Sequence, residues 1–139
     1  MVDERGLRQI QENADFAVAR LGPLSDVEFG LNAASVEWVM GFIERRRTRP
    51  DAQDLDVLVA VLGSFLGACI VAATGGNWHR VDGHGWGVRL PCGSTAFPFA
   101  KVHKQLLFGT VGGDSIAGFY LVRRQRSGLQ AGDEADRPA

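Results

Sequence analysis

The sequence predicts a small α+β domain in which about five helices, one of them central and buried, pack on a small antiparallel sheet. Three features carry this prediction. Apolar residues recur at helical spacing in several segments, one long segment is apolar on all sides, and residues 77–90 have the pattern of a β-hairpin. With 139 residues, 45% of them hydrophobic, the chain has the length and composition of one domain, which we place at residues 1–126. Residues 127–139 have almost no apolar side chains and are predicted to be a disordered tail.

Two amphipathic helices are predicted in the first third of the chain. Apolar side chains in residues 4–21 lie three and four positions apart, and Gly22-Pro23 then ends the helix, because proline cannot continue it. Asn32 or Ser35 can cap the second helix. That helix ends in a run of arginines at 45–47, which suits the negative end of a helix dipole.

The apolar segment, residues 57–73, carries no charged side chain and has about the minimum length of a membrane span. Glycine and serine lower its hydrophobicity, and amphipathic segments flank it. We therefore expect this segment to be the core helix of a soluble, cytoplasmic protein that does not associate with a membrane. Asp51 and Asp54 are predicted to cap this helix. One face carries small residues, which favour a close helix crossing: Ala60, Gly63, Ser64, Gly67 and Ala68.

The hairpin is predicted to turn at residues 82–85, where glycines can adopt positive φ, and to pair Val81 with Trp86. This register divides the side chains between two faces. The expected core face carries His79, Val81, Trp86, Val88 and Leu90, and the opposite face carries Trp78, Arg80 and Arg89.

The remainder of the chain predicts one more strand and two more helices. A short strand is expected near residues 95–97. Pro98 can open a helix that runs to residue 108, where Gly109 ends it. Asp114 is predicted to cap a last helix that ends in an arginine-rich segment near residue 126.

No catalytic residue, cofactor site or metal site is assigned from the sequence. His79, Asp82 and His84 lack the spacing of zinc signatures. Cys69 and Cys92 are expected to be free thiols, and no base can be assigned to either. The net charge of −1 argues against a nucleic-acid partner.

One candidate interaction surface stands out, formed by Trp78, Arg80 and Arg89 beside Lys101 and Lys104. Tryptophan and arginine are the residue types that most often anchor protein interfaces. The alternative is that Trp78 is covered by another part of the chain or stacked on an arginine.

A pattern of short motifs spans residues 29–120. It includes Phe29-Gly30, residues 35–38, residues 62–67, residues 98–104 and Gly113-Asp114-Ser115. In this pattern the chain resembles a family of small bacterial proteins catalogued only as a domain of unknown function. Members of that family often have an acidic residue where Ala68 stands and glycine where Ala100 stands. The resemblance implies no established activity, so no functional residue is carried over.

Two functions are consistent with these features. The first is a non-catalytic protein-interaction module, such as an immunity-type or regulatory partner binder, with a homodimer as a further option. The second is a domain that binds a small anionic molecule, or acts on one, through the hairpin and the 97–104 corner. In that second hypothesis Lys101, Lys104, His103 and Arg89 form the binding pocket.

Overall fold

The computed structural model describes residues 4–47, 55–111 and 115–125. In chain order the elements are α1 (Glu4–Leu21), the short 3-10 helix η1 (Gly22–Leu24), α2 (Ala33–Arg47), α3 (Leu55–Thr74), β1 (Asn77–Val81), β2 (Gly85–Arg89), β3 (Thr95–Ala96), α4 (Pro98–Phe108) and a last helix over residues 116–125. The predicted α+β class and antiparallel sheet, including the third strand, are confirmed. The predicted caps Asp51, Asp54 and Asp114 and the predicted tail 127–139 lie outside the described residues.

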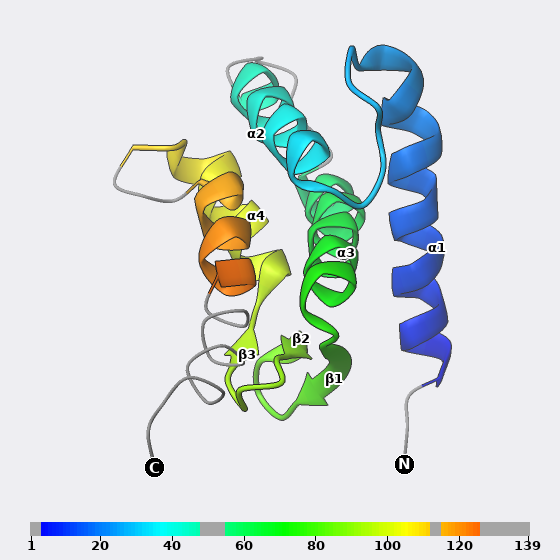
Figure 1. Cartoon of the computed structure of the whole chain (residues 1–139), viewed down its shortest axis with the longest axis vertical. Coiled ribbons are helices and arrows are strands. Elements are labelled where there is room, and N and C mark those ends of the chain that lie inside the picture. The colour runs from blue at the N-terminus through cyan, green and yellow to red at the C-terminus, as the bar shows by residue number, and fades with distance from the viewer. Residues whose placement is uncertain (1–3, 48–54, 112–114, 126–139) are drawn as a thin grey trace, which may run out of the picture.

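Helix α3 lies at the centre of the fold, with α1 packed along one side and α4 along the other (Figure 1). From Leu62 to Ile70 its residues are buried except for the half-buried Ala68. Among the described helices, α3 alone has the length and composition to cross a membrane, and 44% of its most apolar stretch is buried. Core helices meet the same criteria, so this is only weak evidence for a span.

The small residues of α3 allow two close approaches. A Cβ added at Gly63 would lie 3.0 Å from the Cα of Phe99, so the start of α4 contacts the α3 backbone directly. One turn later, a Cβ added at Gly67 would lie 2.1 Å from two ring carbons of Trp78. The predicted close crossing is therefore confirmed at Gly63, whereas Gly67 makes room for an indole ring.

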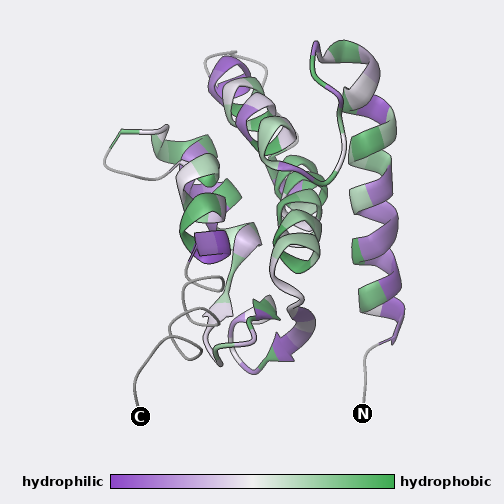
Figure 2. Ribbon diagram, viewed as in Figure 1, coloured by the Kyte–Doolittle hydropathy of each residue, from purple (hydrophilic) through white to green (hydrophobic). Residues whose placement is uncertain are grey.

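Helix α1 is amphipathic, as predicted, and Figure 2 shows hydrophobic and hydrophilic residues alternating along it while α3 is hydrophobic over most of its length. Of the two predicted caps for α2, Asn32 and Ser35, the structure shows Asn32, whose Oδ1 accepts the Ser35 backbone N–H at 2.9 Å. Ser35 Oγ in turn accepts the backbone N–H of Gly30 at 2.9 Å. Phe29 stacks on Phe65 of α3. The linker between α1 and α2 is thus held against the core.

The predicted hairpin register is wrong by one residue. Val81 pairs with Gly85, and Trp78 pairs with Val88. The physical reason is the loop, in which the His84 backbone N–H donates to the Val81 carbonyl at 3.0 Å and Gly83 and Gly85 both have positive φ. Three residues, 82–84, therefore separate Val81 from its partner, whereas the predicted pairing of Val81 with Trp86 leaves four, 82–85.

The corrected register moves Trp78 to the other face of the sheet. Paired residues share a face, so Trp78 lies on the same face as Val88, which is fully buried. This face packs toward α3, and Trp78 is half-buried against Gly67 and Phe99. His79, which we had placed on the core face, lies on the opposite face with Arg89.

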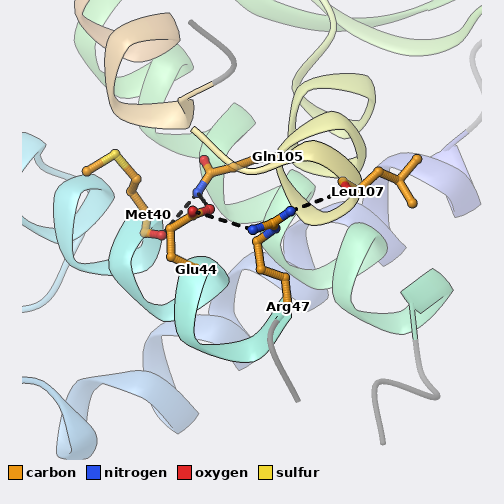
Figure 3. Close-up of polar contacts among 5 residues, drawn as sticks. All are labelled: Met40, Glu44, Arg47, Gln105 and Leu107. Atoms are coloured by element: carbon orange, nitrogen blue, oxygen red, sulfur yellow. Dashed lines mark hydrogen bonds and ion pairs between the residues drawn. The ribbon is translucent and has the colours of Figure 1, made fainter. Parts of the chain in front are cut away.

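One buried polar side chain, Gln105 of α4, joins three helices, and Figure 3 shows its two hydrogen bonds to α2. Its Nε2 donates to the Met40 carbonyl at 3.1 Å and to Glu44 Oε2 at 3.0 Å, both in α2. Its Oε1 accepts the backbone N–H of Ile116 at 2.9 Å. Leu106, next to Gln105 on the same helix, is also buried, whereas Leu107 is exposed.

Candidate functional site

The five residues of the predicted interaction surface do not form one patch. Trp78 faces α3, whereas Lys101 and Lys104 line a separate pocket beside β3. Arg80 and Arg89 are both exposed but extend from opposite faces of the sheet. The sheet therefore divides the predicted surface, because the one-residue change in register reverses the face on which Trp78 lies.

Trp78 instead lines an apolar groove of about 520 Å³, together with residues of α1, α3 and the α1–α2 linker. We call this feature the apolar groove. Small residues of α1 and α3 create its depth, since Ala14 and Ala68 leave space that larger side chains would fill. Its lining consists of Ile10, Gln11, Ala14, Asp15, Val18, Ala19, Gly30, Leu31, Ala68 and Trp78. No pattern in the sequence indicated this groove, because its walls come from four segments: α1, the α1–α2 linker, α3 and β1.

The second concave feature, which we call the basic pocket, has a volume of about 350 Å³. Its lining consists of Thr95, Phe97, Ala100, Lys101, Lys104, Phe119 and Arg123. Among the lining residues that the structure describes, three side chains are cations and none is a carboxylate. The sequence had indicated Lys101 and Lys104, which are three residues apart on one helix. Arg123 belongs to the arginine-rich segment at the end of the last helix, to which the sequence analysis assigned no binding role.

Phe119 holds two of the three cations at the basic pocket. The guanidinium carbon of Arg123 lies 4.1 Å from the centre of the Phe119 ring, and Lys101 Nζ lies 5.9 Å from it. Cation–π attraction of this kind stabilises both side chains near one ring although their charges repel. The ring therefore brings a cation of α4 and a cation of the 116–125 helix together at one place.

The basic pocket is continuous with the outer face of the sheet. Thr95 Oγ1 lies 3.3 Å from His79 Nε2, and Gly87 of β2, which separates their strands, has no side chain to come between them. His84 of the hairpin loop contacts the ring of Phe97. His103 is exposed on α4 and, like Arg89, does not line the pocket. Of the four residues of the sequence-based pocket, Lys101 and Lys104 line this concave feature, whereas His103 and Arg89 lie outside it.

The described residues give no support to a metal or cysteine-based site. No group of three or more His, Cys, Asp or Glu side chains lies close enough to hold a metal within residues 4–47, 55–111 and 115–125. Neither Cys69 nor Cys92 forms a disulfide bond, and Cys69 is buried in α3. Burial raises the pKa of the Cys69 thiol from 9.0 to about 12, because the thiolate would lose its hydration.

The two thiols are therefore expected to differ in reactivity. At about pH 8, a thiol reagent should modify the half-buried Cys92 rapidly and Cys69 only after unfolding. The measurement is the number of thiols titrated in native protein and in denaturant, with Cys92→Ser as the control that leaves only Cys69. Rapid native labelling of that variant would contradict the burial of Cys69.

The same pKa predicts a loss of stability in alkali. The unfolded thiol of Cys69 ionises near pH 9, but the folded thiol keeps its proton to about pH 12. The folded state therefore binds more protons in this range, and the stabilisation from Cys69 is present below pH 9 and is lost progressively above it. The free energy of unfolding of the wild type should fall more steeply between these pH values than that of Cys69→Ala, and equal slopes would contradict this prediction.

Comparison with known proteins identifies no relative of this chain. No protein-family model matches the chain, and no curated protein or solved structure gives a significant match. The resemblance to a family of unknown function therefore stays a prediction.

Proposed function

We propose that this chain is a non-catalytic, cytoplasmic protein-interaction module that receives an apolar side chain of a partner protein in the apolar groove. The groove itself is the observation that carries the proposal. Seven of its ten lining residues are Ile10, Ala14, Val18, Ala19, Leu31, Ala68 and Trp78, all of them apolar or aromatic. Leu31 is 45% exposed at its edge, so a partner that covers it removes apolar surface from water.

The polar residues of the groove favour a protein partner over a metabolite. A metabolite pocket usually brings together several polar groups that orient the ligand. Here the polar side chains are Gln11 and Asp15, which both lie exposed on α1. Asp15 carries the one charge in the lining, and it complements a cation on the partner. The expected ligand is therefore a segment with a Leu, Ile, Phe or Trp anchor next to Lys or Arg.

Selection from a library of random peptides tests this proposal. Enriched peptides should share an apolar anchor near a basic residue, and Leu31→Glu should weaken their binding about tenfold or more, because it places a charge in the apolar contact. Asp15→Asn should weaken binding less and reduce its dependence on salt. Amide NMR signals of Ala14 and Ala68 should shift when a selected peptide is added.

Leu24→Glu is the matched control, because Leu24 is exposed in η1 and does not line the groove. It should bind the selected peptides with the affinity of the wild type. The proposal is wrong if the peptides bind Leu31→Glu as well as they bind the wild type, or if the enriched sequences share no apolar anchor. Light scattering during gel filtration would show whether a second copy of the chain takes the place of the peptide.

The anion-binding alternative is favoured by a separate observation, the basic pocket. It uses Lys101 and Lys104, as the sequence-based hypothesis did, but includes Arg123 where that hypothesis had Arg89 and His103. The two features have no lining residue in common. Variants of one can therefore be tested without altering the other.

A further inference from the structure

We infer that the basic pocket is a binding site for a small molecule that carries a phosphate group. Its three cations come from two helices that are distant in sequence: Lys101 and Lys104 from α4, and Arg123 from the 116–125 helix. The net charge of the chain is −1, so a general attraction of anions by the whole protein cannot supply the binding. The attraction is local to this pocket.

The start of α4 adds a second source of positive potential at the same place. Phe97, which precedes α4, and Ala100, in its first turn, both line the pocket. Phe97, the N-cap residue, has an apolar side chain and makes no capping hydrogen bond to this helix end. The N-terminal end of a helix carries a partial positive charge and backbone N–H groups, which together favour phosphate.

The identity of the donors indicates phosphate more than a carboxylate. An arginine offers a planar pair of N–H donors, two lysines offer point charges, and the Thr95 hydroxyl offers one more hydrogen bond. This set matches an oxyanion with three terminal oxygens and nearly two negative charges. A single carboxylate offers these donors one oxygen fewer and about half the negative charge of a phosphate group.

The size and the walls of the pocket limit the rest of the ligand. A volume of about 350 Å³ is near the lower end of the range for small-molecule sites, which suits a metabolite of modest size. Phe97, Ala100 and Phe119 provide an apolar wall for its organic part. The ligand is therefore a compact phosphate monoester.

NMR titration of the full chain with glycerol 3-phosphate, inorganic phosphate and succinate tests the inference. We expect saturable shifts for the phosphate monoester at the amides of Thr95, Ala100 and Lys101, with weaker binding as salt is raised. Lys104→Gln and Arg123→Gln should each weaken binding about tenfold, since each removes one charged contact. Lys104 is exposed, so its replacement leaves the fold intact, and a wild-type amide spectrum verifies this.

Arg8→Gln is the matched control, because Arg8 is an exposed cation of α1 that lies outside both concave features. It should bind the phosphate monoester within about twofold of the wild type. Shifts that do not saturate, or an equal loss in Arg8→Gln, would overturn the site. Succinate binding as tight as the phosphate monoester would overturn its assignment to phosphate. Leu31→Glu should leave this titration unchanged, so the failure of either proposal can be told from the failure of the other.

Discussion

Replacement of Gln105 by leucine is expected to lower the free energy of unfolding by about 3 kcal/mol. Leucine has nearly the volume of glutamine, so the change removes hydrogen bonds and leaves no large cavity. The buried backbone N–H of Ile116 would lose its acceptor, and Glu44 would lose a donor 3.0 Å away. An unpartnered buried group costs about 1–3 kcal/mol, and a hydrogen bond to a charged group contributes about 1.5–3 kcal/mol.

Urea denaturation of Gln105→Leu beside His103→Gln measures this effect. His103 is exposed on the same helix, so its replacement should change the free energy of unfolding by no more than about 0.5 kcal/mol. Amide hydrogen exchange adds a local measurement. Protection should fall first in the 116–125 helix, because Gln105 accepts the N–H at its start. A loss below about 1 kcal/mol with unchanged exchange would show that the three helices are held together without Gln105.

Replacement of Gly67 by alanine is expected to destabilise the fold by about 2 kcal/mol. In most helices this change is stabilising by about 1 kcal/mol, because alanine has the higher helix propensity. Here the new Cβ would lie 2.1 Å from the indole of Trp78 and 3.1 Å from Pro98. A rigid ring cannot move away without displacing β1 from α3, so the steric cost exceeds the gain in propensity.

A double-mutant cycle with Trp78→Ala identifies the cause. Gly67→Ala should cost much less when the indole is absent, and the coupling energy should be about 1–2 kcal/mol. Gly41→Ala is the matched control within a helix, because its Cβ would meet only the flexible end of Arg45, at 3.2 Å. That change should stabilise the protein by up to about 1 kcal/mol. Additive effects in the cycle, or a stabilised Gly67→Ala, would contradict the contact between α3 and Trp78.

Local patterns in the sequence predicted the helices and the sides of them that are buried. The three- and four-residue spacing in residues 4–21 and the break at Gly22-Pro23 predicted α1 with its observed bounds. The apolar segment that follows residue 55 predicted the central helix, and Pro98 and Gly109 predicted the start and end of α4. These predictions succeeded because capping, chain breaking and amphipathic spacing depend on residues close together in the chain.

The register of the hairpin could not be predicted from residues close together in the sequence. Glycines at 83 and 85 are compatible both with the predicted four-residue turn at 82–85 and with the observed three-residue loop at 82–84, and the two loops place opposite side chains on the core face. Space on α3 is consistent with only one of them, since the indole of Trp78 occupies the position where Gly67 has no side chain. That contact joins residues of two elements, and no periodicity within either element reveals it.

Both candidate binding sites likewise depend on the tertiary structure. Apolar composition predicted that α3 would be buried, and helical spacing predicted that Lys101 and Lys104 would share one turn of α4. Only the packing of the 116–125 helix placed Arg123 beside them, and only the crossing of α1 over α3 produced the apolar groove. Helical spacing sets which side chains share a face, but the shape and charge between two elements follow from how those elements pack.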